Sequence, residues 1–289
     1  MERNPRNMAK ISSFNNPNSQ DQPTMVKTLL LILIVPFLSG CLDLVEPAGY
    51  DDTQDIVFYN NFAEEEGVIA TDSGILYRIL EQGDGNRPRN SSYIFTRYVG
   101  YSINREDQFD TGNNLEIFQP TSMQFFQGLG EILVLMSPGA RYEIVLPSEQ
   151  AAQNGRVYFF DMVMDSWLLE PGQFLTQNVQ REEVSETESG LQYRIIEEGT
   201  GDTPTENSRV RINYKGSYTN DYIFDQANNS TFLLRDTIQG FREGVQLIGE
   251  GGTIEMWIPS EIGYGDNTPS TILPGAVLVF EVDLIELLD

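Results

Sequence analysis

The residue types in this chain limit its chemistry before any fold is considered. There is no histidine, and Cys41 is the only cysteine. Without histidine there is no Ser-His-Asp or Cys-His nucleophile, no imidazole proton shuttle and no histidine-ligated zinc or non-haem iron site. A lone cysteine excludes intramolecular disulfides, four-cysteine zinc sites and iron–sulfur clusters. The chemistry that remains uses carboxylates, tyrosines or a desolvated pocket, and we expect neither a metal nor a cofactor.

The charge balance excludes one class of partner. The 289 residues include 18 Lys and Arg against 43 Asp and Glu, which gives a formal charge of −25 and a pI near 4.2. Such a surface repels phosphate backbones, so nucleic acid is not an expected partner. The acidic clusters Asp51-Asp52 and Glu64-Glu65-Glu66 lack the spacing of a calcium loop and are interpreted as solvated charge. A hydrophobic content of 40% is ample for a packed core.

The neighbourhood of Cys41 resembles a bacterial lipoprotein signal. A nine-residue apolar run, LLLILIVPF, is too short to span a bilayer and has the length of a signal-peptide core. It leads directly into Leu38-Ser39-Gly40-Cys41, which resembles a lipobox, in which the cysteine is diacylated and the leader is cut before it. We therefore expect residues 1–40 to be a leader, with Met25 as an alternative translation start, and Cys41 to carry the lipid. The other interpretation is a buried strand with an incidental cysteine.

An internal repeat sets the domain organisation. The segment TDSGILYRI at 71–79 restarts as TESGLQYRI at 187–195, at a spacing of 116 residues. The same spacing pairs Tyr98 with Tyr214, and small gaps later Phe160 pairs with Phe280. Repeats of this length predict two homologous domains rather than a solenoid. The expected division is a leader at 1–40, a tether and short helical lead-in at 41–70, a first domain at 71–168, a join at 169–187 that is a short helix or an acidic linker, and a second domain at 188–289.

Each copy is mostly strand-like, with one helical stretch. Apolar residues alternate with polar ones around 210–214, 254–258 and 278–284, which predicts strands. Phe241, Val245 and Ile248 have helical spacing and are followed by glycines. The pattern predicts an α+β fold in which a twisted antiparallel sheet wraps on one short helix in each domain.

The second copy resembles the FKBP-type peptidyl-prolyl cis-trans isomerases along its whole length. The motifs that carry the resemblance are SGLQY at 189–193, GTG at 199–201, VRINYKG at 210–216, FD at 224–225, IQGF at 238–241, IPS at 258–260, YG at 264–265, ILP at 272–274 and LVFEV at 278–282. Residues 58–68 resemble the end of the helical lead-in of bacterial envelope members. Rotation about an X–Pro bond faces a barrier of roughly 18–20 kcal/mol because amide resonance must be broken. The activity implied lowers this barrier without forming a bond to a nucleophile.

The resemblance also implies a set of site residues. Tyr214, Phe224, Phe241 and Phe280 would line the proline pocket, with Thr237 and Ile238 at its edge, Asp225 beside the twisting amide, and Ile272 and Leu273 in the flap. The Ile238 backbone N–H and the Tyr264 hydroxyl would each bind a substrate carbonyl. The plainer interpretation is that the aromatic residues are only core.

Three departures from the family pattern bear on catalytic efficiency. The pocket floor, commonly tryptophan in the family, is Phe241. The segment between Phe224 and Phe232 is short and holds no arginine to pair with Asp225. The loop that follows Tyr264 is short and acidic.

The first copy lacks part of this site. Only ten residues separate Glu149 from Phe160, against eighteen between Glu261 and Phe280, so counterparts of Tyr264 and of the flap are missing. Its floor position is Leu129. Tyr98, Phe109 and Asp110 survive. We therefore expect residues 71–168 to be an inactive domain that serves as a spacer, a client platform or a dimer surface.

Taken together, the sequence predicts a lipid-anchored isomerase of a bacterial envelope, active in its second domain. Its substrates would be unfolded or partly folded, proline-containing exported proteins, and its membrane contact would be the lipid on Cys41. Leu42 after that cysteine favours the outer membrane, facing the periplasm or the cell exterior. The alternative is a non-catalytic chaperone that binds proline-containing segments in the same pocket. A third hypothesis is a structural lipoprotein of a surface assembly.

Overall fold

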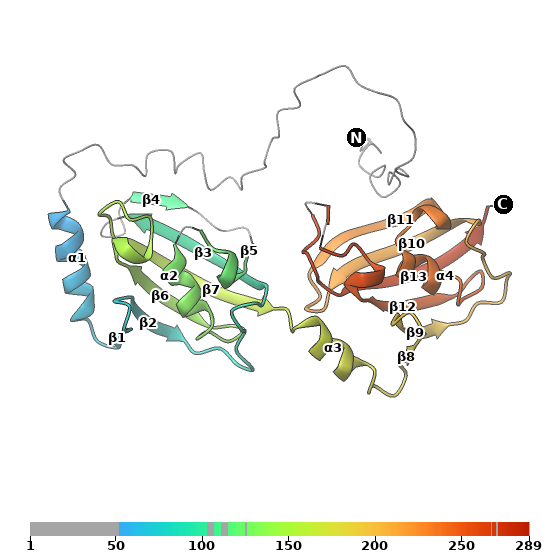
Figure 1. The fold of residues 1–289 in the computed structure, drawn as a ribbon, viewed down its shortest axis with the longest axis horizontal. Helices are drawn as coiled ribbons and strands as arrows, with labels where there is room; N and C mark the ends of the chain where they lie inside the picture. Colours follow the sequence, from blue (N-terminus) through green and yellow to red (C-terminus); the bar gives the residue numbers. More distant parts are fainter. Residues whose placement is uncertain are drawn as a thin grey trace, which may run out of the picture. The chain divides into compact units, whose positions relative to one another are not determined.

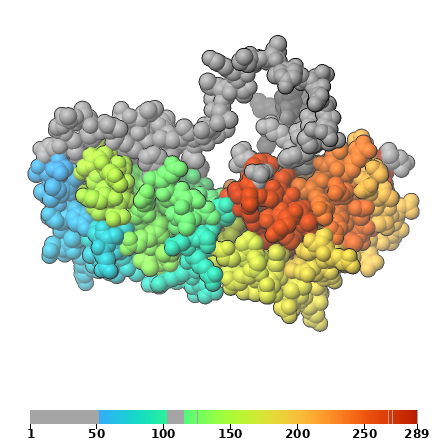
Figure 2. All heavy atoms as spheres, viewed as in Figure 1, coloured from blue at the N-terminus to red at the C-terminus, as the bar shows by residue number. Residues whose placement is uncertain are grey.

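The computed structural model describes residues 52–102, 107–110, 115–124, 126–266, 268–269 and 271–288. The expected leader and Cys41 lie outside these residues, as do the side chains of Phe109 and Asp110. The described chain divides into two compact units, one ending at Leu168 and the other beginning at Leu169. In Figure 2 the first unit runs from blue to yellow-green and the second from yellow to red.

The first unit is an antiparallel sheet with two helices (Figure 1). The strand order is β1-β2-β6-β7-β3-β4, and β5 also pairs with β3. Its elements are α1 (Thr53–Ala63), β1 (Val68–Ala70), β2 (Leu76–Glu81), β3 (Ile94–Ser102), β4 (Asp107–Asp110), β5 (Glu116–Phe118), the 3-10 turn η3 (Pro120–Ser122), α2 (Gln127–Leu133), β6 (Arg141–Leu146), η4 (Ser148–Gln150) and β7 (Tyr158–Trp167).

The second unit repeats this plan. Its strands are ordered β11-β10-β13-β12-β9-β8, and every pairing is antiparallel. Its elements are α3 (Pro171–Asn178), β8 (Ser185–Glu186), β9 (Gln192–Glu197), β10 (Arg209–Tyr218), β11 (Ile223–Leu233), η5 (Leu234–Asp236), α4 (Gln239–Val245), β12 (Thr253–Ile258), η6 (Ser260–Ile262) and β13 (Leu278–Leu287). The prediction of an α+β fold with antiparallel sheets is confirmed.

In the second unit, two helices cover opposite faces of the sheet. Met256 and Ile258 on β12 face α4, so closely that a side chain on Gly244 or Gly240 of that helix would collide with them. Successive strand residues point to opposite faces, and Trp257 accordingly lies on the other side, with the Arg181 guanidinium 5.0 Å from its ring centroid.

The helix α3 lies on that outer face with Trp257. Asn178 at the end of α3 is buried and donates a hydrogen bond from Nδ2 to the side chain of Gln192, at 3.0 Å. Gln192 pairs with Trp257 across β9 and β12, so the two side chains share a face of the sheet. The join therefore contains a helix, and the acidic run at 181–186 follows that helix and leads into β8.

The first unit has the same arrangement with a more apolar outer face. Ile144 and Leu146 on β6 belong to the core beneath α2, whereas Val145 between them belongs to a second cluster with Phe62 of α1 and Phe159 of β7. Phe62 is 1% exposed and meets the Phe159 ring edge-on, with 6.1 Å between centroids. The helix α1 is thus held by an apolar cluster of its own.

Matching hydrogen bonds show how closely the units correspond. The Ser73 hydroxyl donates to Glu131 at 2.6 Å, and the Ser189 hydroxyl donates to Glu243 at 2.7 Å. Each bond ties the start of the repeat to the helix on the inner face. The sequence repeat is therefore a repeat of tertiary contacts as well.

The helix on the inner face is shorter than its apolar spacing predicts. α4 ends at Val245, and Ile248 lies beyond it in a turn closed by the Leu247 N–H, which donates to the Gly244 carbonyl at 3.0 Å. Ile248 is nevertheless 1% exposed. Burial alone therefore accounts for its apolar character.

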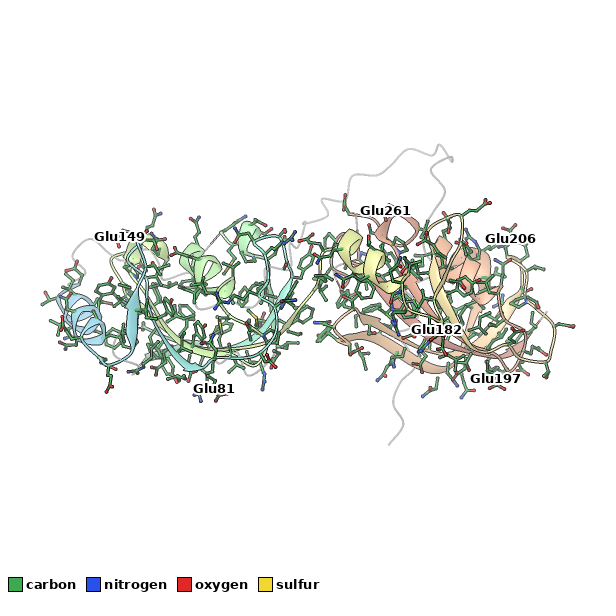
Figure 3. The ribbon with its side chains drawn as sticks, turned by 90° about the horizontal axis from the view of Figure 1, so that it is seen from below. Glu81, Glu149, Glu182, Glu197, Glu206 and Glu261 are labelled. Carbon is green, nitrogen blue, oxygen red and sulfur yellow. The ribbon has the colours of Figure 1, made fainter. Side chains whose placement is uncertain are left out.

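Both units carry exposed acidic side chains, while Asp55 and Glu143 of the first unit are buried. The labelled glutamates in Figure 3, which include Glu81, Glu149, Glu197 and Glu206, are exposed and point away from the sheets. Across the described part of the chain, no helix has the length and apolarity needed to cross a membrane.

Candidate active site

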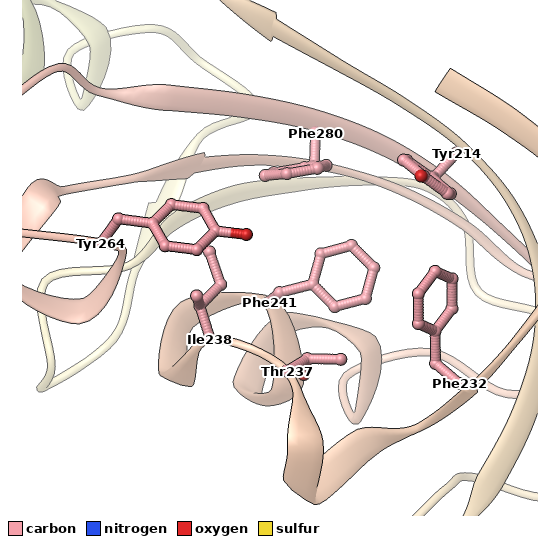
Figure 4. A pocket seen from close by; sticks show the side chains of 7 residues that line it. All are labelled: Tyr214, Phe232, Thr237, Ile238, Phe241, Tyr264 and Phe280. Carbon is pink, nitrogen blue, oxygen red and sulfur yellow. The ribbon is translucent and has the colours of Figure 1, made fainter. Parts of the chain in front are cut away.

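A cavity opens between α4 and the inner face of the second sheet (Figure 4). It is narrow, with a volume of about 20 Å³. The residues that line it are Tyr214, Phe232, Thr237, Ile238, Phe241, Tyr264 and Phe280. They come from β10, β11, the turn before α4, the helix itself, the loop after β12, and β13, so six separate segments must fold before the cavity exists.

Four aromatic rings form the walls and floor. Phe241 on α4 meets Phe280 edge-on, with 5.2 Å between ring centroids and 81° between planes. Tyr214 and Phe232 are in the same kind of contact, at 5.7 Å and 70°. Edge-to-face pairs of this kind fix ring orientation as well as distance. The walls are therefore rigid and apolar, and they leave space rather than collapsing onto one another.

Glycines allow the rings to take these positions. A side chain on Gly216 would come within 2.7 Å of Cε2 of Phe224 and 2.9 Å of Cε1 of Phe280. A side chain on Gly240 would lie 2.5 Å from Cγ2 of Ile258, so that glycine brings α4 against β12 and places Phe241 at the floor. Two of the glycines in the sequence motifs are thus explained by close packing at the site.

Two hydrogen-bond donors at the rim have no partner among the described residues. One is the Ile238 backbone N–H, at the N-terminal end of α4, where the chain is extended with φ −62° and ψ 151°. The other is the Tyr264 hydroxyl, which points over the cavity in Figure 4. By contrast, the Thr237 hydroxyl already donates to the Leu234 carbonyl at 2.7 Å and holds the turn that precedes Ile238.

A carboxylate lies next to the cavity. The Tyr214 hydroxyl donates to Asp225 Oδ2 at 2.8 Å. Burial, followed by this hydrogen bond and the charge of Asp225, raises the pKa of Tyr214 above its ordinary value of 10.0. Burial and the same carboxylate also raise the pKa of Tyr264. Both phenols therefore keep their protons at neutral pH, and Tyr264 remains able to donate.

The structure brings most of the predicted residues together. Six of them line the cavity: Tyr214, Thr237, Ile238, Phe241, Tyr264 and Phe280. Phe224 stands behind the wall, with its ring 5.7 Å from that of Phe280, and Asp225 adjoins Tyr214.

Two predicted residues lie further away, and one lining residue was missed. Ile272 and Leu273 do not line the cavity. Phe232 does, although it was not predicted as a site residue. It is the residue after the polar run Asn228 to Thr231, and periodicity gave no sign that β11 would turn it towards Phe241.

In the first unit the corresponding space is filled by a side chain of that unit. Phe126 holds the position of Ile238, directly before the inner helix, but adopts a left-handed conformation with φ 54°. Its ring is 3% exposed and lies 5.3 Å from Phe160 and 5.0 Å from Tyr158, centroid to centroid. Phe160 is the counterpart of Phe280, so Phe126 covers the ring that borders the cavity in the second unit.

The fold and the cavity together define a class of protein. Rigid aromatic walls, two unpaired donors at the rim and a nearby carboxylate suit a small apolar ring that is flanked by carbonyl groups. The described residues around it supply no metal-ligating cluster. The second unit is therefore an α+β domain with an apolar pocket and two hydrogen-bond donors at its rim.

Comparison with known families agrees with this class. Residues 201–285 match the model of the FKBP-type peptidyl-prolyl cis-trans isomerase domain, and residues 166–195, which include α3, match the domain amino-terminal to it. A Neisseria meningitidis protein named as a probable FKBP-type peptidyl-prolyl cis-trans isomerase FkpA is 31% identical over 69% of this chain and 74% of its own length.

Other relatives match a smaller share of the chain, and the chain spans about half of their own length. The FKBP-type 22 kDa isomerase of Escherichia coli is 37% identical over 40% of this chain and 58% of its own length. FkpA of Aeromonas hydrophila is 38% identical over 39% of this chain, which spans 44% of that protein. The crystal structure of FkpA from Escherichia coli has 30% identity and a TM-score of 0.40, over 40% of this chain and 57% of the other. The chain belongs to the FKBP-type peptidyl-prolyl cis-trans isomerase family.

Proposed function

We propose that the second unit catalyses cis–trans isomerisation of X–Pro bonds in its aromatic cavity. The observation that carries the proposal is the combination of apolar ring walls with two unpaired donors, the Tyr264 hydroxyl and the Ile238 N–H, at one rim. Family membership supports the reaction type.

The geometry suits the chemistry of a rotating amide. The planar amide is held by resonance, and rotation without a catalyst takes tens to hundreds of seconds. The twisted amide has less charge separation, so a dry apolar cavity stabilises it relative to the planar form. Proline would lie over Phe241, between Tyr214 and Phe280, where water is excluded.

The polar groups would hold the flanking chain while the bond turns. The Ile238 N–H and the Tyr264 hydroxyl each offer a donor to a substrate carbonyl, which would fix the peptide in a turn on either side of proline. Asp225 would lie beside the rotating amide, held in place by the hydrogen bond from the Tyr214 hydroxyl. No proton is transferred and no covalent bond is made.

The cellular setting that we propose follows from the leader. The signal-like segment before Cys41 supports export and lipid attachment in a bacterial envelope, with the outer membrane favoured by Leu42. Substrates at that location would be unfolded or partly folded exported proteins whose proline bonds must isomerise. The acidic surface of both units keeps the tethered body soluble above a membrane.

The first unit is proposed to be inactive. Phe126 covers the position of the cavity, and the short connection before Phe160 leaves no counterpart of Tyr264. This unit would serve as a spacer, client platform or dimer surface. Tyr98→Ala is expected to leave the isomerase rate of the whole chain unchanged.

A protease-coupled assay of X–Pro isomerisation by the full chain tests the activity. The unaltered chain should accelerate isomerisation of a chromogenic proline tetrapeptide, and Tyr264→Ala and Asp225→Ala should each slow it, with Tyr98→Ala as the matched control in the first unit. A rate equal to that without protein would reject catalysis and favour the chaperone alternative. In that case, binding of an unfolded proline-rich chain should still be lost with Phe241→Ala.

A further inference from the structure

The Tyr218 side chain is hydrogen-bonded to the flap of the second unit. None of the sequence motifs indicates that this residue contributes to the site. Tyr218 is the last residue of β10 and is 1% exposed. Its hydroxyl accepts a hydrogen bond from the Leu273 N–H at 2.9 Å and donates one to the Thr271 carbonyl at 3.3 Å. One phenol thus satisfies a donor and an acceptor within the same short stretch of backbone, which uses both capacities of the group.

Two further hydrogen bonds of this stretch are internal to it. The Thr268 hydroxyl donates to the Ile272 carbonyl at 2.6 Å, and the Ile272 N–H donates to the Pro269 carbonyl at 2.9 Å. The base of the flap is closed by backbone hydrogen bonds, since the Ala276 N–H donates to the Leu273 carbonyl at 3.3 Å and the Gly275 N–H donates to the Gly265 carbonyl at 3.2 Å. The Tyr218 hydroxyl joins Thr271 and Leu273 to β10.

Tyr218 is also part of the wall behind the cavity. Its ring lies 5.0 Å from that of Phe224, which in turn lies 5.7 Å from Phe280 at the cavity. Its backbone is fixed at both ends of the hairpin turn, since its N–H donates to the Tyr222 carbonyl at 2.9 Å and its carbonyl accepts from the Asp221 N–H at 3.0 Å. Tyr218, which holds the flap, is therefore fixed by its backbone hydrogen bonds and by ring contacts that continue to the cavity wall.

The first unit shows what this position holds where no flap exists. Strand register makes Ser102 the counterpart of Tyr218, because Ser102 pairs with Tyr158 as Tyr218 pairs with Leu278. Ser102 is buried as well, at 7% exposed, so the position belongs to the interior in both units. The long side chain with a terminal hydroxyl occurs in the copy that has a flap to hold.

We propose that Tyr218 is a positioning residue that fixes the flap at Leu273 and thereby sets the preference of the site for the residue before proline. This rests on the proposed isomerase function. Ile272 and Leu273 are carried by the stretch that the hydroxyl holds, so its loss lets these apolar side chains shift relative to the cavity. A mobile flap still admits proline but discriminates less between neighbours of different size.

The test is Tyr218→Phe in the full chain, with Tyr193→Phe on β9 as the matched loss of a hydroxyl from a half-buried tyrosine. The assay uses a tetrapeptide series with Ala, Leu or Phe before proline. For Tyr218→Phe, kcat/KM should fall about three- to tenfold for the Leu and Phe peptides, the size expected for one hydrogen bond, through KM rather than kcat. The Ala peptide should change less, so the preference flattens. Tyr193→Phe should match the unaltered chain on all three peptides.

Amide hydrogen exchange separates this proposal from the function beneath it. Exchange at Leu273 should accelerate in Tyr218→Phe and stay unchanged in Tyr193→Phe, whether or not the protein catalyses anything. An inactive parent chain would overturn the proposed function and leave this exchange result standing. An active parent whose Tyr218→Phe variant keeps both its peptide preference and its Leu273 protection would overturn the role proposed for Tyr218.

Discussion

The two units of this chain share one plan but differ in what lies above the central ring of the inner face. In the second unit Phe280 borders the cavity and is 7% exposed, whereas in the first Phe160 is 0% exposed beneath Phe126. The antiparallel sheet, the inner helix and the serine–glutamate bond recur in both, although β4 and β5 both pair with β3 in the first unit where β11 alone pairs with β10 in the second. The cavity therefore differs from a packed core only locally, and in the first unit the Phe126 side chain fills the corresponding space.

The difference also shows what each unit spends on stability. Phe126 gains the burial of a large ring but holds a left-handed backbone, which costs roughly 1–2 kcal/mol in a residue other than glycine. The second unit forgoes that burial and keeps Ile238 extended, with its N–H facing the rim. Functional sites commonly give up packing in this way.

The largest expected effect comes from removing the central ring in each unit. Phe160→Ala should lower the free energy of unfolding of the first unit by about 3–5 kcal/mol, as for other buried phenylalanines, and leave isomerisation unchanged. Phe280→Ala should cost less stability, because the ring already borders empty space, but should reduce kcat/KM by at least about tenfold through loss of the wall. Urea unfolding and the isomerase assay on both variants check this. Loss of activity in Phe160→Ala alone would contradict the assignment of the site.

Removing the Phe126 ring should create in the first unit the space that the second unit already has. Phe126→Gly should lower its free energy of unfolding by about 2–4 kcal/mol, the cost of the lost ring offset by relief of backbone strain. Phe126→Ala should be less stable than the glycine variant by about 1 kcal/mol, because alanine keeps the strain. The space created should take up a small apolar molecule such as benzene, detected by NMR. Equal stability of the two variants would show that the left-handed backbone carries no cost here.

A smaller effect is expected from removing the Tyr264 hydroxyl, which has no counterpart in the first unit. Tyr264→Phe should lower kcat/KM about fivefold, the effect of one ordinary hydrogen bond. The control is Tyr158→Phe in the first unit, whose hydroxyl accepts a hydrogen bond from Asn154 at 2.8 Å and should not affect activity. Identical rates for Tyr264→Phe and the unaltered chain would remove Tyr264 from the mechanism.

The smallest effect concerns alkaline pH. The pKa of Tyr214 is raised in the folded protein, so above the ordinary phenol pKa the unfolded chain loses this proton before the folded chain does. The folded state then binds more protons, and the free energy of unfolding falls as pH rises beyond about 10. Tyr214→Phe should flatten this decline, as measured by urea titrations between neutral and alkaline pH. An equally steep decline in the variant would contradict the assigned cause.

Much of the fold followed from local pattern. Alternating residues marked β10, β12 and β13, because one face of each strand is buried and period 2 is visible in the sequence. The end of α4 was less predictable, since Ile248 is buried from a turn and mimics a further helical position. The join was left open between helix and linker, because the acidic run at 181–186 that follows α3 is typical of a solvated segment.

The site residues were likewise predictable only where a short local motif marked them. Residues within short motifs, such as Phe241 and Tyr264, were placed by resemblance to the family. Phe232 and Tyr218 were not, because their roles depend on which strands pair and on where a loop distant in sequence returns. Contacts that join β10 to residues more than fifty positions away leave no local signature.

The sequence by itself determined the chemistry that is excluded, the repeat, the family and the motif residues of the second unit, because composition and spacing record these directly. Tertiary structure decided which of two similar domains keeps an open cavity, since that depends on one ring turning inward from a left-handed residue at Phe126. It also decided that the Tyr218 hydroxyl meets the flap. Both outcomes rest on packing between segments far apart in the chain, where volume and hydrogen-bond geometry are settled only on folding.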